Sequence, residues 1–324
     1  MPNCIYCETN QNVKKIMVVP HYHLNPKGHP YYLCNYCGII FEDPKIYLSN
    51  TFDFSKSVED LTDEDLKIFQ LNFLEAIDIS DSDGNLYSGY DYEESVMEIG
   101  LFNKIDNVIN KYTDFKKSDK FSMLEIGCGT GFILKRMKNK YPNCEFVGVD
   151  PSPVSCRKGK SSGLNILQGT MDTVTLQNET FDVVICLGNL QLHENPLNTL
   201  KKARAVLKNG GLLLFETKNP ASLVRIMAKT LINLPFIRRL SFVKYITRHA
   251  WDNMRFGFER TVLKNIIEEM DFKLNYIETK PPRLIGYKNN YFLSRSLPGL
   301  LWNITDKIDT IRGQRAWVEV CCKK

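Results

Sequence analysis

The sequence predicts an α/β fold in which helices cover both faces of a doubly wound, mostly parallel sheet. Three observations predict it. Between residues 118 and 218 apolar runs of strand length alternate with helical segments, the first run enters a glycine-rich loop, and the second run ends in an aspartate. In such a sheet the ligand binds where the loops leave the carboxyl ends of the strands. A chain of 324 residues can hold this domain together with attachments at both ends.

The first strand and its loop form the most informative segment. Residues 121–134, FSMLEIGCGTGFIL, predict a buried strand that ends near Glu125, a loop with three glycines, and the start of a helix. Missing side chains at the glycines let the backbone approach a ligand closely. A nicotinamide dinucleotide site is the rival interpretation, but its fingerprint requires a third glycine where this chain has Phe132.

The second strand is predicted at residues 144–150, CEFVGVD, and ends in Asp150. A carboxylate at this position can accept hydrogen bonds from both hydroxyls of a ribose. The remaining elements follow in order: a third strand at 164–172, a fourth at 181–189, a helix from Glu194 that Gly210 and Gly211 stop, and a fifth strand at 212–217.

Together these segments resemble the class I methyltransferases, in which an acid stands two residues before G-x-G-x-G. The resemblance covers about residues 118–218 and implies a seven-stranded Rossmann-like sheet that binds S-adenosylmethionine. The loop would contact the methionine part, Asp150 the ribose, and Thr170 and Met171 the adenine. Family members often carry aspartate where Thr170 stands, so Asp172 is an alternative. The implied cofactor-binding residues are Glu125, Gly127, Cys128, Gly129, Gly131, Asp150, Pro151, Thr170, Met171 and Leu187.

Ten cysteines include two C-x2-C pairs near the N-terminus, CIYC and CNYC, with residues 8–33 between them. Two such knuckles can close a tetrahedral site around one zinc ion, so residues 1–50 predict a zinc-ribbon-like module with a structural metal. Disulfides or free thiols are the alternatives. Three histidines lie between the pairs, but four cysteines already complete the site. The predicted ligands are Cys4, Cys7, Cys34 and Cys37.

The remaining segments are predicted from composition and from the same resemblance. Residues 51–117 begin with an acidic segment followed by apolar residues near helical spacing, and this pattern predicts a helical cap or linker. The methyltransferase domain would span residues 118–324, with two more strands near the end, the last antiparallel, and with insertions at 219–257 and 283–313. The first insertion holds seven basic residues against one acid, Asp252. It predicts either a lid with solvated basic residues or a contact with an anionic acceptor or a membrane surface.

The candidate catalytic groups follow from the chemistry of methyl transfer, which needs alignment and, for an oxygen or nitrogen acceptor, a base. His193, just after the fourth strand, is the first candidate, because an unshifted imidazole accepts a proton near neutral pH. Many relatives carry histidine here, although counting back from Pro196 places Leu192 at their position. His249 is the reserve, and Tyr90, with Tyr92, would cover the cofactor. Packing or capping is the alternative role for each of them.

The layout as a whole resembles a bacterial subgroup of these enzymes that methylates intermediates of surface polysaccharides, lipid-linked glycans or secondary metabolites; YYLCNYCGIIFEDP at 31–44 looks like its zinc-knuckle motif. The expected function is methyl transfer from S-adenosylmethionine to a small-molecule, sugar or lipid-linked acceptor, through oxygen, nitrogen or carbon. Methylation of RNA is an alternative, but nucleic acid is the less favoured partner because no N-P-P-Y or D-P-P-Y motif follows the fourth strand. The second alternative is a non-catalytic protein that only binds the cofactor.

Composition places the protein among ordinary globular chains, with 43% hydrophobic and 24% charged residues. The net charge of +5 would favour an anionic partner without identifying one. The N-terminal segment has no apolar core typical of a signal peptide, and no apolar run reaches the length of a membrane span. We therefore expect a cytoplasmic protein, with peripheral contact at the inner membrane face as an alternative.

Overall fold

The computed structural model describes residues 1–19, 28–43, 96–115, 119–251, 254–281 and 297–324. Most of the predicted cap at 51–117, including Tyr90 and Tyr92, and the first half of the insertion at 283–313 lie outside the described residues. No helix in these described ranges is both long enough and apolar enough to cross a membrane.

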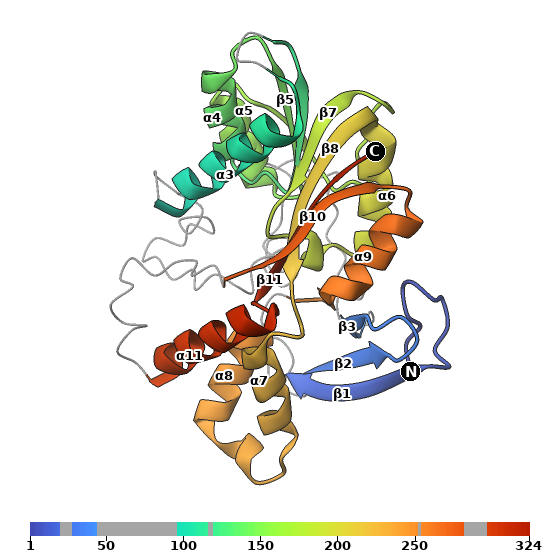
Figure 1. Ribbon diagram of the computed structural model, residues 1–324, viewed down its shortest axis with the longest axis vertical. Helices are drawn as coiled ribbons and strands as arrows, with labels where there is room; N and C mark the ends of the chain where they lie inside the picture. The colour runs from blue at the N-terminus through green and yellow to red at the C-terminus, as the bar shows by residue number, and fades with distance from the viewer. Residues whose placement is uncertain (20–27, 44–95, 116–118, 252–253, 282–296) are drawn as a thin grey trace.

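A seven-stranded sheet forms the centre of the molecule, as the sequence predicted (Figure 1). Its strand order is β10-β11-β8-β7-β4-β5-β6; β4 to β8 are parallel, and β11 runs antiparallel to both of its neighbours. The strands are β4 (Ser122–Ile126), β5 (Glu145–Asp150), β6 (Asn165–Gln168), β7 (Phe181–Cys186), β8 (Leu207–Lys218), β10 (Lys273–Lys280) and β11 (Trp317–Lys323).

Helices cover both faces of this sheet. One face packs against α3 (Val96–Tyr112), α4 (Phe132–Lys140) and α5 (Pro153–Ser161), and the other against α6 (Pro196–Val206) and α9 (Arg260–Glu269). The strands therefore bury apolar side chains on both sides, which explains their nearly continuous hydrophobic sequences. The doubly wound arrangement places the loops after β4, β5 and β7 together at one edge of the sheet.

The helix α6 is shorter than the sequence predicted. We expected Gly210 and Gly211 to stop it, but it ends at Val206, and the following residues already belong to β8. Leu207 is fully buried and pairs with Phe181 of β7, so burial of this leucine starts the strand before the glycines are reached.

A second, antiparallel sheet lies beyond the carboxyl end of β8. It consists of β1 (Val13–Val19), β2 (His29–Cys34), β3 (Ile40–Glu42) and β9 (Phe256–Gly257) in that order. The first three strands come from the N-terminal segment, and β9 comes from the end of the 219–257 insertion. The same insertion supplies α7 (Leu223–Asn233), the short helix η4 (Ile237–Arg239) and α8 (Ser241–Trp251), whose apolar faces pack on β1 and β2.

Of the six basic residues in this insertion whose burial the structure describes, two are not solvated, contrary to expectation. Arg225 and Arg255 are buried and bind main-chain carbonyl oxygens. Arg225 lies in α7 and donates to three segments at once: Nε to Ala250 O at 2.7 Å, Nη1 to Ala316 O at 2.7 Å, and Nη1 to Asn219 O at 2.9 Å. Its role is therefore to hold backbone segments together.

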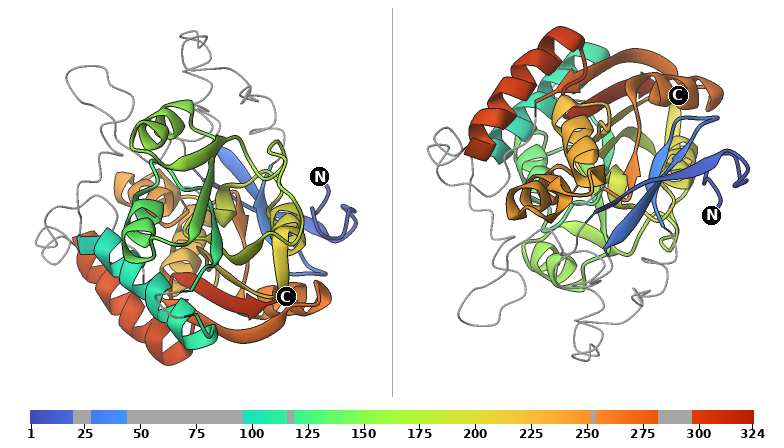
Figure 2. Two further views of the ribbon diagram at one scale, coloured as in Figure 1. Left: turned by 90° about the horizontal axis from the view of Figure 1, so that it is seen from above. Right: turned by 90° about the horizontal axis from the view of Figure 1, so that it is seen from below.

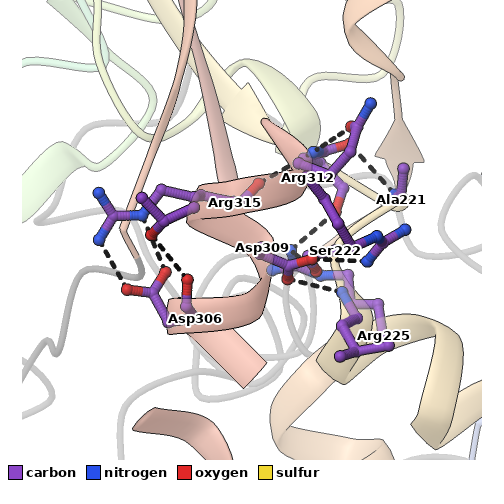
Figure 3. A network of polar contacts seen from close by, with 11 residues as sticks. Ala221, Ser222, Arg225, Asp306, Asp309, Arg312 and Arg315 are labelled. Atoms are coloured by element: carbon purple, nitrogen blue, oxygen red, sulfur yellow. Dashed lines mark hydrogen bonds and ion pairs between the residues drawn. The ribbon is translucent and has the colours of Figure 1, made fainter. Parts of the chain in front are cut away.

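A polar network surrounds Arg225 and joins α7 to the helix α11 (Leu297–Arg312), as Figure 3 shows. Asp309 of α11 is buried, and its Oδ2 accepts a hydrogen bond from the Leu223 amide at 2.7 Å, at the first turn of α7. Asp306 forms an ion pair with Arg315 at 2.6 Å, just before β11. These contacts attach the two helices to the ends of β8 and β11.

Candidate functional site

The loop after β4 has the geometry that its glycines predict. Gly127, Gly129 and Gly131 all have positive φ, at 72°, 55° and 81°, a conformation that side chains rarely adopt. A Cβ at Gly127 would lie 1.8 Å from Asn189 Nδ2, and one at Gly131 would lie 2.5 Å from Leu164 Cδ1, but one at Gly129 would meet nothing within 4 Å. Gly129 therefore borders open space, while its two neighbours pack against the protein.

Asp150, at the carboxyl end of β5, fixes the position of this loop. Its Oδ2 accepts a hydrogen bond from the Gly129 amide at 2.7 Å, and its Oδ1 accepts one from the Ser152 amide at 2.9 Å. Burial raises the pKa of Asp150 to about 6, against the opposing effect of these two amides. Cys128 is buried in the loop, and Pro151 is half-buried beside the aspartate.

Glu125, near the end of β4, is a second buried carboxyl group. Burial, and then the negative charge of Asp150, raise the pKa of Glu125 to about 8. Its Oε2 is buried and has no hydrogen-bond partner among the described residues. A buried carboxyl oxygen without a partner is costly unless a donor or a cation reaches it. The group is therefore suited to lie near a positively charged ligand.

Asn189, after the end of β7, closes the site from the other side, and sequence analysis did not predict this role. Its Nδ2 donates to Ile126 O at 2.9 Å and to Gly127 O at 3.2 Å, so it holds the last turn of β4. Leu187, two residues earlier, is half-buried. The sequence shows only a polar residue three positions after the end of β7, which does not by itself reveal this contact.

The predicted adenine-side residues lie after β6 with different surroundings. Thr170 is half-buried, and its Oγ1 accepts a hydrogen bond from the Asp172 amide at 3.2 Å. The Met171 side chain is buried in the main core. Asp172 is exposed and forms an ion pair with Lys202 of α6 at 2.8 Å, so its carboxylate is engaged with that helix.

His193 follows η3 (Leu190–Leu192), the short helix after β7. Its Nδ1 lies 2.8 Å from Thr199 Oγ1, and the Thr199 hydroxyl lies within reach of Asn195 O at 3.3 Å. Burial, opposed by Asp172 and assisted by the Arg255 charge, lowers the pKa of His193 to about 4. The expectation of an unshifted imidazole is therefore wrong, although a neutral imidazole can still accept a proton at pH 7. His249 lies in α8, and its side chain is outside the described residues.

The four N-terminal cysteines come together from two separate turns. Their sulfur atoms all lie within 4.8 Å of one another; Cys4 and Cys37 are 3.5 Å apart and Cys7 and Cys34 are 3.8 Å apart. Four sulfurs placed about 2.3 Å from a central zinc in a tetrahedron are about 3.8 Å apart. The observed spacing thus fits such a metal. The hydrogen bond between Cys4 and Cys37 lowers the pKa of the Cys4 thiol to about 6 and, together with burial, raises the pKa of Cys37, while burial raises the pKa of Cys7 to about 11.

Comparison with known proteins identifies the domain that carries this loop. Residues 124–213 match the family model described as a methyltransferase domain, and this range runs from β4 into β8. This part of the chain is a methyltransferase domain. The last strand along the chain, β11, lies between β10 and β8 and runs antiparallel to both, as the resemblance implied for the final strand.

Curated relatives match the methyltransferase domain at low identity. The chain is 29% identical over 144 residues to malonyl-[acyl-carrier protein] O-methyltransferase of Halalkalibacterium halodurans, covering 42% of this chain and 52% of that protein. It is 31% identical over 107 residues to ubiquinone biosynthesis O-methyltransferase of Actinobacillus pleuropneumoniae, covering 30% and 45%. It is 28% identical over 103 residues to tRNA U34 carboxymethyltransferase of Saccharophagus degradans, covering 29% and 31%. The chain thus spans about half, or less, of the length of these relatives.

Among solved structures, a possible histamine N-methyltransferase from Thermotoga maritima is similar to this chain with a TM-score of 0.44 and 18% identity. The alignment covers 70% of this chain and 90% of that one.

Proposed function

We propose that this protein transfers a methyl group from S-adenosylmethionine to a small-molecule, sugar or lipid-linked glycan acceptor. The observation that carries the proposal is the open side of Gly129, held by Asp150 at the carboxyl edge of a methyltransferase sheet. The cofactor, when bound, supplies an electrophilic methyl group on a sulfonium. The transfer is an in-line displacement, so the protein contributes mainly alignment and exclusion of water.

Each group at the site then has a role that its surroundings support. The backbone at Gly129 allows close approach of the methionine part, and Glu125 offers a buried carboxyl oxygen to a positive charge. Asp150 still has lone pairs on both oxygens, and we assign these to the ribose hydroxyls. Leu187 and Thr170 would line the remaining path of the cofactor.

We assign His193 as the general base for an oxygen or nitrogen acceptor. With Nδ1 held by Thr199, the lone pair on Nε2 is available in the neutral ring, and the low pKa keeps the ring neutral at pH 7. The acid limb of kcat should then lie near pH 4 to 5. A limb near pH 6.5 that survives in His193→Gln would contradict the assignment.

The proposed methyl acceptor is a class of compounds: a small molecule, a sugar or a lipid-linked glycan. The curated relatives are named for three chemically different acceptors, so they support methyl transfer without selecting one of them. A lipid-linked acceptor would require the enzyme to work at the surface of a membrane. A screen of nucleotide sugars and lipid-linked glycans with labelled S-adenosylmethionine tests the class directly. Transfer to any acceptor would exclude a purely binding role.

Binding of S-adenosylmethionine to variants of the loop is the direct test of the site. Gly129→Arg fills the open space with a strained, bulky residue, and Asp150→Ala removes the carboxylate that anchors Gly129, so calorimetry should show affinity reduced by at least about tenfold in each. Gly163→Arg is the matched control, because Gly163 also has positive φ and open space around it, but lies after α5. Unchanged affinity in both loop variants, with the fold intact, would remove the proposal.

We also propose that the four-cysteine cluster holds one structural zinc ion. A site with four thiolates has no open coordination position, so the metal would stabilise the N-terminal turns and would not take part in catalysis.

A further inference from the structure

The turn that joins α7 to α8 carries an unusual concentration of exposed apolar side chains. We call residues 234–242 the tip. Phe236 is 89% exposed and Leu240 is 56% exposed, while Leu234 and Phe242 are 41% and 38% exposed. Across the described residues nine large hydrophobic side chains are exposed to this degree, and four of the nine lie in the tip. Single exposed apolar residues are normal, but a contiguous group marks an interaction surface.

These side chains are not needed to pack the two helices. The helices α7 and α8 bury a different set of residues against β1 and β2, and η4 inside the tip has no buried residue. In Figure 1 the tip projects from the end of the molecule that is furthest from the seven-stranded sheet. Ile237 packs against the core that these helices form with β1 and β2, but the four exposed apolar side chains of the tip (Leu234, Phe236, Leu240 and Phe242) are directed largely to solvent.

The charge of the segment selects the partner. Arg238 and Arg239 are exposed between Phe236 and Leu240, and Lys229 and Lys244 are half-exposed in the adjoining helices. From residue 219 to residue 251 the sequence contains no aspartate or glutamate. A short convex turn of apolar and cationic residues fits a surface that offers hydrocarbon and negative charge together. A stable protein interface needs about 800 Å² on each partner, which is large for a turn of this length.

We propose that the tip inserts Phe236 and Leu240 into the interface of an anionic lipid bilayer while Arg238 and Arg239 contact the lipid headgroups. The inference does not depend on methyl transfer, because it rests on residues outside the cofactor site. It gives the enzyme a reversible membrane contact through a structured part of the chain. If the acceptor is lipid-linked, this contact holds the methyltransferase domain at the surface that carries the substrate.

Vesicle co-sedimentation of the full chain tests the proposal. The parent should bind vesicles that contain phosphatidylglycerol, bind vesicles of phosphatidylcholine alone at least about tenfold more weakly, and lose most of its binding at about 1 M salt, where the screening length is near 3 Å. Arg238→Glu/Arg239→Glu should weaken binding by at least about 25-fold, because each basic side chain near an anionic surface contributes about fivefold. Phe236→Ser should weaken it by on the order of tenfold.

Ile311→Ser is the matched control. Ile311 is also 89% exposed, but it lies at the end of α11, so its replacement should leave vesicle binding unchanged. Calorimetry with S-adenosylmethionine should give the same affinity for all tip variants, which shows that each still folds. No binding of the parent to anionic vesicles at low salt would overturn the proposal, as would equal binding by parent and Phe236→Ser. Binding of the parent only to an acidic protein or to RNA would also overturn it.

Discussion

Two carboxyl groups at the carboxyl edge of the sheet behave differently from ordinary surface acids. Burial raises the pKa of Glu125 to about 8 and that of Asp150 to about 6, so at pH 7 Glu125 holds its proton in most ligand-free molecules. Because the pKa of each acid is higher in the folded protein than in the unfolded chain, ionisation of the acid destabilises the folded state. The ligand-free protein should therefore lose stability from these groups as the pH rises from about 4 to about 8.

Binding of the cofactor should change the protonation of Glu125. A positive sulfonium and ammonium near the buried carboxyl favour the carboxylate and lower its pKa, so binding at pH 7 should release part of a proton. Calorimetry in buffers with different ionisation enthalpies measures this release as a dependence of the observed enthalpy on the buffer. In Glu125→Gln the dependence should disappear. The same enthalpy in every buffer for the parent would show that Glu125 does not face the cofactor.

At the scale of elements, the strand–loop–helix unit around the glycines was predictable because all of its signals are contiguous. The apolar run of β4, the glycines and the start of α4 follow one another, and each needs only local physics. Asn189 was not predictable, because its amide contacts Gly127 across the sheet. The end of α6 was also missed, since the burial of Leu207 depends on its pairing with β7.

The N-terminal turns give a prediction at the same scale. Cys4 and Cys7 lie on one turn and Cys34 and Cys37 on another, so one zinc ion would link the two turns directly. Protein purified without added metal should contain close to one zinc per chain by metal analysis. Cys34→Ser should lose the metal and lower the melting temperature by several degrees, because removing a structural site typically costs several kcal/mol.

Cys144→Ser is the control for the zinc experiment, because this cysteine is half-buried far from the cluster in sequence and is not one of its members. It should keep the zinc content of the parent. A metal-free parent that melts at the same temperature as the metal-containing protein would exclude a structural zinc.

At the scale of the whole molecule, the N-terminal module and the basic insertion are one structure. The pairing of Phe41 with Phe256 joins β3 to β9, and the Arg255 guanidinium donates to Leu192 O at 3.1 Å, next to His193. Sequence analysis described the N-terminal module and the insertion as separate attachments, because the two-residue strand β9 is too short to show a periodic pattern. The contacts that connect the N-terminal sheet to the methyltransferase domain are therefore visible only in three dimensions.

Arg225 provides the sharpest test of how this assembly is held together. Arg225 is 3% exposed, and its guanidinium binds carbonyl oxygens of Asn219, Ala250 and Ala316, which belong to three parts of the chain. In the right view of Figure 2, the N-terminal strands in blue lie beside the helices α7 and α8. Burial lowers the pKa of Arg225 to about 10, so the side chain remains charged at neutral pH.

Arg225→Met keeps much of the side-chain volume but leaves these buried carbonyl oxygens without their donor. Each hydrogen bond to a charged group is worth about 1.5–3 kcal/mol, so we expect the free energy of unfolding to fall by roughly 3–5 kcal/mol. Arg238→Met, at an exposed position of the same insertion, should change it by less than about 0.5 kcal/mol. Denaturant unfolding, followed by circular dichroism, measures both. If the two variants unfold at the same denaturant concentration as the parent, the carbonyl oxygens are satisfied by other means and Arg225 does not hold the assembly together.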